Sequence, residues 1–127
     1  VHGFNWLGLE PGYFGIMAAS SPEKMDRVVE IILEDVAALR TQTVPDEELE
    51  KAKTICVTME QLSRQTNGSM ALQAALNELY GLGYDHGDDY AERIASVTAA
   101  DVQRVARKYF THYTLVRTGP ETPATKE

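Results

Sequence analysis

Residues 44–53, Val-Pro-Asp-Glu-Glu-Leu-Glu-Lys-Ala-Lys, open the segment that decides the fold, and this segment continues to Leu62. Proline suits the first turn of a helix because its missing N–H would be unbonded there in any case. The three acids that follow place negative charge on the positive end of the helix dipole. Apolar residues then recur at a spacing of three and four, at Leu49, Ala52, Cys56 and Met59. This spacing predicts a long helix, and we expect its apolar stripe to be core.

The residues before this helix predict a hairpin followed by a first helix. Two segments rich in aromatic residues, Gly3–Leu9 and Tyr13–Ala19, flank a Glu-Pro-Gly turn signal at residues 10–12, and we expect two paired strands. Ser21, which is followed by proline, is typical of a helix start, with its hydroxyl as the N-cap. Apolar residues at helical spacing then extend this helix to about Arg40.

Three further helices and a strand are predicted after the long helix. The Gly-Leu-Gly sequence at residues 81–83 ends the first of these helices. Asp88 or Asp89 would cap the second, and Thr98 with Asp101 would form a capping box for the third. The expected bounds are Ser69–Tyr80, Tyr90 to about Ser96 and Thr98–Tyr109 for the helices, and His112–Thr118 for the strand.

The order of elements, two strands, five helices and one strand, indicates an α+β fold. Five helices followed by a single strand cannot all be crossovers between parallel strands, so we expect them to cover one face of a small sheet that contains antiparallel strands. Residues 1–120 would form one domain, and residues 121–127 a flexible tail. Three strands are few for this helical layer. We therefore infer that strands are missing and come from another part of a parent chain or from a second copy.

Composition limits the class of protein. The chain has 127 residues, enough for one ordinary domain, and 43% of them are apolar, enough for a core. The net charge of −7 argues against binding to nucleic acid or to an anionic membrane surface. No apolar run is long enough to span a membrane, and the first residues do not resemble a signal peptide. Because no initiator methionine is present, we expect a piece of a longer chain. We expect this piece to be soluble, and we favour the cytoplasm over the periplasm or an organelle.

The residue types that carry chemistry do not form a recognisable site. His2, His86 and His112 are far apart in the sequence and have no zinc-ligand spacing. Cys56 lies on an apolar stripe, where a thiol is most often inert, and it has no second cysteine with which to form a disulfide. No Gly-x-Ser-x-Gly motif occurs. We therefore predict no catalytic residue and no metal ligand in this chain, and the sequence identifies no substrate-binding residue.

Other conspicuous residues have a structural explanation. The acids at residues 46–48, and those at 85, 88 and 89, are explained as charges near helix starts and not as a paired-acid or calcium site. We expect Trp6 to be buried in the hairpin. The methionines are expected to fill the core, and they are Met17, Met25, Met59 and Met70.

Several segments occur in a recognisable order. They are residues 12–16 (Gly-Tyr-Phe-Gly-Ile), 21–24 (Ser-Pro-Glu-Lys), 44–53, 94–102, 109–110 and 116–120 (Val-Arg-Thr-Gly-Pro). Together they resemble the second half of a domain of the insulinase-type metallopeptidases, peptidase family M16, which includes insulinase, pitrilysin and the mitochondrial processing peptidase. The resemblance extends over about residues 12–120.

The resemblance implies a half-domain of the M16 (LuxS/MPP-like) fold. In this family zinc is held by an inverted His-x-x-Glu-His helix and a later glutamate, and none of these matches a position here. The arginine and tyrosine that the C-terminal domain places near the substrate also match no position. The resemblance therefore implies the inactive C-terminal domain, which carries no cofactor and encloses a peptide substrate together with a zinc-bearing catalytic domain or subunit. Members of the family also include inactive core subunits of respiratory complexes, so the resemblance alone does not make the parent protein a peptidase.

Two functions of different classes follow from these observations. The first is a non-catalytic, structural part of the substrate chamber of an M16-type zinc peptidase. The alternative is a free-standing helical interaction module that assembles through exposed strands. Under either hypothesis we expect the chain to form a homo-oligomer, because the strands near Gly3–Leu9 and Tyr13–Ala19 lack neighbours and bare sheet edges tend to pair.

Overall fold

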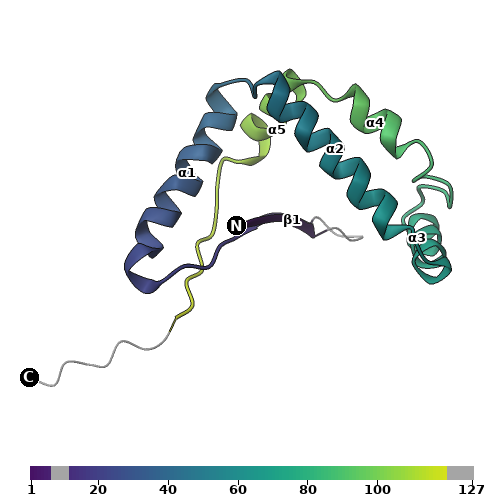
Figure 1. The fold of residues 1–127 in the computed structure, drawn as a ribbon, viewed down its shortest axis with the longest axis horizontal. Coiled ribbons are helices and arrows are strands. Elements are labelled where there is room, and N and C mark those ends of the chain that lie inside the picture. Colours follow the sequence, from purple (N-terminus) through teal and green to yellow (C-terminus); the bar gives the residue numbers. More distant parts are fainter. Residues whose placement is uncertain (7–11, 120–127) are drawn as a thin grey trace, which may run out of the picture.

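A computed structural model describes residues 1–6 and 12–119, and it shows an α+β fold (Figure 1). Within the described residues there are five α-helices and one antiparallel sheet of two strands. None of the described helices is both long and apolar enough to cross a membrane. The elements in chain order are β1 (His2–Trp6), β2 (Tyr13–Met17), a 3₁₀ turn η1 (Pro22–Lys24), α1 (Met25–Thr41), α2 (Asp46–Ser63), α3 (Asn67–Leu79), α4 (Tyr90–Ser96) and α5 (Ala99–Tyr109).

The predicted hairpin is present as the antiparallel pair β1 and β2. His2 lies opposite Met17, and Phe4 lies opposite Gly15. Alternation along the strands places the rings of His2, Phe4 and Tyr13 on one face, where His2 and Phe4 stack with centroids 6.3 Å apart. Gly15 leaves room for the Phe4 ring, because a Cβ there would lie 2.5 Å from that ring and displace it. The predicted turn at residues 10–12, and the predicted end of the first strand, fall largely outside the described residues.

The helices form an open arch above the hairpin (Figure 1). In one half α1 packs on α5, and in the other half α2 packs on α4. The Nε of Arg107 on α5 donates a hydrogen bond of 2.8 Å to the carbonyl of Arg40 in the last turn of α1. This contact places a cation at the negative end of the α1 dipole. On the other side of the arch, the Nζ of Lys53 donates to the carbonyl of Ala95 at 3.1 Å.

The helix boundaries largely follow the prediction. The long helix predicted within residues 44–62 is observed as Asp46–Ser63, and on it Glu47 and Lys51 form an ion pair at 2.7 Å. The capping box between Thr98 and Asp101 is also present. Gly81 and Gly83 end α3 with φ values of 73° and 90°, a backbone conformation that suits glycine.

Two predicted N-caps are wrong. The Ser21 hydroxyl makes no capping hydrogen bond, because a 3₁₀ turn comes before α1 and separates Ser21 from the regular helix. Asp89 precedes α4 but makes no cap either, since its carboxylate pairs with Arg93 at 2.7 Å instead. Asp88 pairs with Arg64 at 3.3 Å. Both aspartates therefore form ion pairs with arginines and do not cap α4.

The predicted strand over His112–Thr118 is absent from the described part of the chain. Residues 112–119 follow α5 without regular secondary structure. Arg117 holds this segment against the start of α1 through a 2.6 Å ion pair with Asp26. Strand geometry requires a neighbouring strand to bond its backbone, and the described sheet contains only β1 and β2.

The apolar residues do not close into a core. Ala106 on α5 is the one apolar residue that is fully buried among those described, with 1% of its surface exposed. The chain exposes 10558 Å², whereas a compact protein of 14.1 kDa exposes about 6,700 Å². The expected burial of Trp6 is therefore wrong, as is that of Met17, Met59 and Met70. The α2 stripe is likewise mostly exposed, because no element of the described chain packs on it.

Candidate interaction surface

Two exposed apolar rows lie on consecutive helices. On α2 the row consists of Ile55, Met59 and Leu62, and Met59 is 62% exposed. On α3 the row consists of Leu72, Leu76 and Leu79. Each row has a spacing of three and four residues, the pattern by which a helix packs on a partner. We call these residues the α2 row and the α3 row.

The opposite side of α3 is the side that the chain itself covers. Asn77 is only 7% exposed, and its backbone carbonyl accepts a hydrogen bond from the Leu82 N–H at 2.9 Å. Its side-chain Nδ2 has no hydrogen-bond partner within the described residues. A small hollow between α3 and the following turn is lined by Met70, Gln73 and Ala74 together with Arg64. One face of α3 is thus packed, and the face that carries the α3 row is left without a partner.

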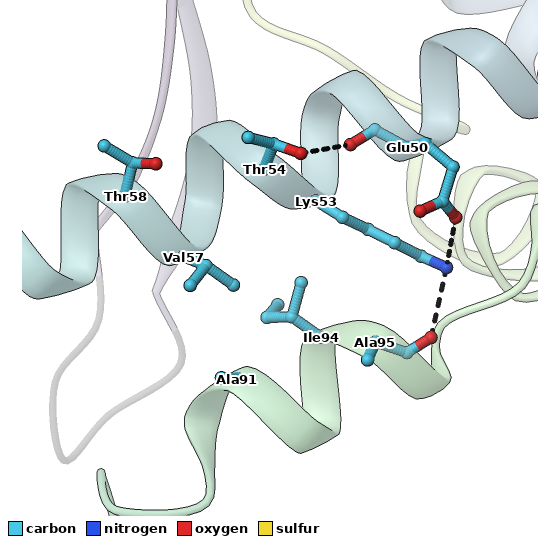
Figure 2. A pocket seen from close by; sticks show the side chains of 8 residues that line it. All are labelled: Glu50, Lys53, Thr54, Val57, Thr58, Ala91, Ile94 and Ala95. Carbon is cyan, nitrogen blue, oxygen red and sulfur yellow. Dashed lines mark hydrogen bonds and ion pairs between the residues drawn. The ribbon is translucent and has the colours of Figure 1, made fainter.

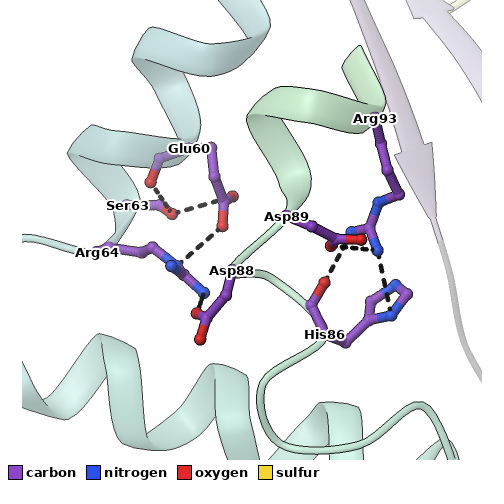
Figure 3. Close-up of polar contacts among 7 residues, drawn as sticks. All are labelled: Glu60, Ser63, Arg64, His86, Asp88, Asp89 and Arg93. Carbon is purple, nitrogen blue, oxygen red and sulfur yellow. Dashed lines mark hydrogen bonds and ion pairs between the residues drawn. The ribbon is translucent and has the colours of Figure 1, made fainter. Parts of the chain in front are cut away.

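Two arginines hold the turn between α3 and α4 (Figure 3). Arg64 at the end of α2 contacts Glu60 at 3.2 Å and Asp88 at 3.3 Å. Arg93 on α4 contacts Asp89, and its Nη2 donates to the carbonyl of His86 at 2.8 Å. The Arg64 contacts tie the turn to the end of α2, and the Arg93 contacts tie it to α4.

Gly87 is buried beneath one of these arginines. A Cβ at this position would collide with the Arg64 guanidinium.

Sequence reasoning did not identify Arg64 or Arg93. The signal was present, because Glu60–Arg64 and Asp89–Arg93 are acid–base pairs four residues apart, one at the end of α2 and one at the start of α4.

An open groove separates α2 from α4 (Figure 2). Val57 and Ile94 face each other across it. At one end, Lys53 bonds Glu50 at 2.8 Å and the Ala95 carbonyl at 3.1 Å. The Thr54 hydroxyl donates to the Glu50 carbonyl at 2.9 Å. The charged groups of the groove are therefore paired with one another, and the groove is a helix–helix contact.

The burial of Tyr90 belongs to the same contact between α2 and α4. Burial raises the pKa of the Tyr90 phenol, and the nearby Cys56 and Glu60 raise it further. This places the Tyr90 side chain against α2. Cys56 itself is exposed.

The histidines do not come together with other metal-ligand side chains. His2 lies on β1, His86 contacts Arg93, and His112 contacts the Thr111 hydroxyl at 3.1 Å. Over residues 1–6 and 12–119, no group of three or more His, Cys, Asp and Glu side chains is close enough to hold a metal ion.

The comparisons with known proteins identify the family from the first part of the chain. Residues 1–56 match the family model described as "Peptidase M16 inactive domain". These residues, fewer than half of the chain, are similar to the M16 inactive-domain family. The matched region contains the hairpin, α1 and the first part of α2. Searches of the curated proteins and of the solved structures found no match.

The family assignment agrees with the resemblance inferred from the sequence. The M16 inactive domain is by its description a non-catalytic part, and it occurs in a family whose context implies a catalytic partner domain. The exposed α2 and α3 rows are consistent with a part that is completed by other elements.

Proposed function

We propose that this chain is a non-catalytic part of the substrate chamber of an M16-type zinc peptidase. In this proposal a separate catalytic domain or subunit carries the zinc. The chain forms part of the wall of the substrate chamber and supplies no group that reacts. The match to the M16 inactive domain is the observation that carries the proposal. The substrate would be a peptide enclosed between the two parts.

The α2 row is the surface that we assign to the catalytic partner. It is apolar, exposed and arranged along one helix, so a partner that covered it would remove a large apolar area from water. Like a protein core, such an interface has no place for an unpaired charge. The polar contacts of α2 with α4 lie on a different face of the helix, and they would not be disturbed.

A pair of lysine substitutions tests this assignment in the assembled parent protein. Met59→Lys places a charge in the α2 row, and Gln61→Lys places the same charge two residues away, outside the row. We expect Met59→Lys to weaken retention of the zinc-bearing domain or subunit at least tenfold, or about 1.4 kcal/mol, and Gln61→Lys to leave it within twofold. Equal retention by both variants would show that the α2 row is not the partner surface.

A free-standing interaction module is the second candidate function. The large accessible surface and the two-stranded sheet favour it, since both are typical of a part that assembles with others. The parent gene separates the two candidates. An upstream or neighbouring reading frame that encodes His-x-x-Glu-His supports the chamber role, and a start codon beside Val1 with no such frame supports the module.

A further inference from the structure

The outer edge of β1 has no neighbouring strand among the described residues. β1 pairs with β2 along its whole length, from His2 opposite Met17 to Trp6 opposite Tyr13. On its other side the described sheet ends. The backbone N–H and C=O groups that point outward from β1 can therefore bond a further strand.

The side chains of β1 favour a second β1 as that strand. If two copies overlap fully and run antiparallel, Phe4 lies opposite Phe4 of the second copy, and His2 lies opposite its Trp6. Opposed residues in an antiparallel sheet point to the same face, so three pairs of rings would meet. The equivalent pairing of two β2 strands would place Gly15 opposite Gly15, with no side chain to pack.

Only one face of the hairpin is available for such a ring cluster. Phe14 points to the other face, where its ring stacks on Phe110 with centroids 5.1 Å apart. The face that carries Trp6 and Tyr13 is open, with 65% and 59% of these side chains exposed. The rings of Phe4 and Tyr13 already meet edge to face at 6.0 Å. A second copy would extend this arrangement.

Charge and surface area permit a dimer at this edge. The chain carries a net charge of −7, but β1 contains no acidic or basic side chain other than His2. Two copies can therefore meet here without opposing carboxylates. A standard interface buries about 800 Å² of each partner, and the exposed Trp6 and Tyr13 lie on the face that would contribute to it.

We propose that two copies of this chain pair antiparallel along β1, with Phe4 on the two-fold axis, and form a four-stranded sheet. The contact is the same on both copies and closes on itself, so assembly stops at the dimer. This proposal does not rest on the peptidase role. It concerns β1, whereas the partner surface proposed above is on α2.

Cysteine pairs test the dimer and its register. In a Cys56→Ser background, a chain with His2→Cys is mixed with a chain with Trp6→Cys under oxidising conditions. We expect a disulfide-linked species of twice 14.1 kDa from the mixture, and little from either variant alone. The matched control mixes His2→Cys with Tyr13→Cys, because Tyr13 is nearly as exposed as Trp6 but lies on β2. Light scattering of the unmodified chain should show mass rising towards the dimer with concentration.

Each other outcome overturns the proposal. A mass of 14.1 kDa at every concentration would mean that the outer edge of β1 pairs with a strand of another protein or with no strand. Links formed by His2→Cys alone or by Trp6→Cys alone would mean a parallel or shifted pairing. A dimer without links, in variants whose helix content is unchanged, would mean that the copies meet through the helices. Equal linking in the Tyr13→Cys control would mean that collision, and not pairing, forms the bonds.

Discussion

Thr98 and Asp101 show how two side chains fix the start of a helix. The Thr98 hydroxyl accepts from the Asp101 N–H at 3.2 Å, and the Asp101 carboxylate accepts from the Thr98 N–H at 3.1 Å. The hydroxyl also donates to this carboxylate at 2.6 Å, and Arg104 donates to it at 3.1 Å. These hydrogen bonds favour the charged carboxylate, and they lower the pKa of Asp101 from 3.8 to about 2.

The sign of the pH dependence follows from this lowered pKa. A carboxyl whose pKa is lower in the folded state stabilises α5 above its unfolded pKa and loses that contribution as the pH falls through the folded value. The window therefore lies between about pH 4 and pH 2. We expect Thr98→Ala to raise the pKa of Asp101 towards 3.8, and Arg104→Ala to raise it by less. A carboxyl NMR titration measures both, and an unchanged pKa in Thr98→Ala would contradict the assigned cause.

At the scale of elements, α3 begins at a cap that the sequence analysis placed too late. We predicted a start at Ser69, whereas the helix runs from Asn67, with the Thr66 hydroxyl accepting from the Ser69 N–H at 3.1 Å. Threonine before an apolar run is a recognised cap signal, so the sequence contained the information.

Alanine substitutions at two candidate caps should have different effects. We expect Thr66→Ala to lower the stability of the first turn of α3 by about 1 kcal/mol, because it removes an observed cap. We expect Ser21→Ala to cost less than about 0.5 kcal/mol, because its hydroxyl caps nothing. Amide hydrogen exchange at Ser69 and at Met25 reports the two changes. If Ser21→Ala lowered the protection of Met25 as much as Thr66→Ala lowers that of Ser69, the assigned cap geometry would be wrong.

Local patterns predicted the elements well, and they failed where a partner decides the outcome. The hairpin, five helices and the Thr98 capping box depend on residues close in sequence, and all are present. Burial and the third strand depend on what lies beside an element. Trp6 and Met59 are exposed because nothing described covers them, and residues 112–118 form no strand because no described strand runs beside them.

Zinc motifs and exposed apolar rows differ in how far sequence spacing alone can locate them. Sequence spacing could show that no zinc motif occurs, because such motifs are local. It could not locate the exposed rows, since the same three-and-four spacing marks a core stripe and an interface. The contacts of Arg64 and Arg93 could have been predicted from the sequence, because an acidic residue stands four positions before each arginine.

At the scale of the whole molecule, the arch has more apolar surface than it can cover. The accessible surface is roughly one and a half times that of a compact protein of the same mass. Helix pairs α1–α5 and α2–α4 are each packed, and beneath the arch lie the hairpin and the segment that follows α5 (Figure 1). Exposed apolar rows such as those on α2 and α3 are typical of interaction surfaces. This open arrangement supports the proposal that the chain is one part of an assembly.

The zinc content and peptidase activity of the purified chain test the central claim most directly. The chain is washed with a chelator, reloaded with zinc and dialysed, and its zinc is measured beside the cleavage of a quenched fluorescent peptide. A non-catalytic chamber part should retain no stoichiometric zinc and should not cleave the peptide. One tightly held zinc ion per chain, together with cleavage that the chelator abolishes, would contradict the account.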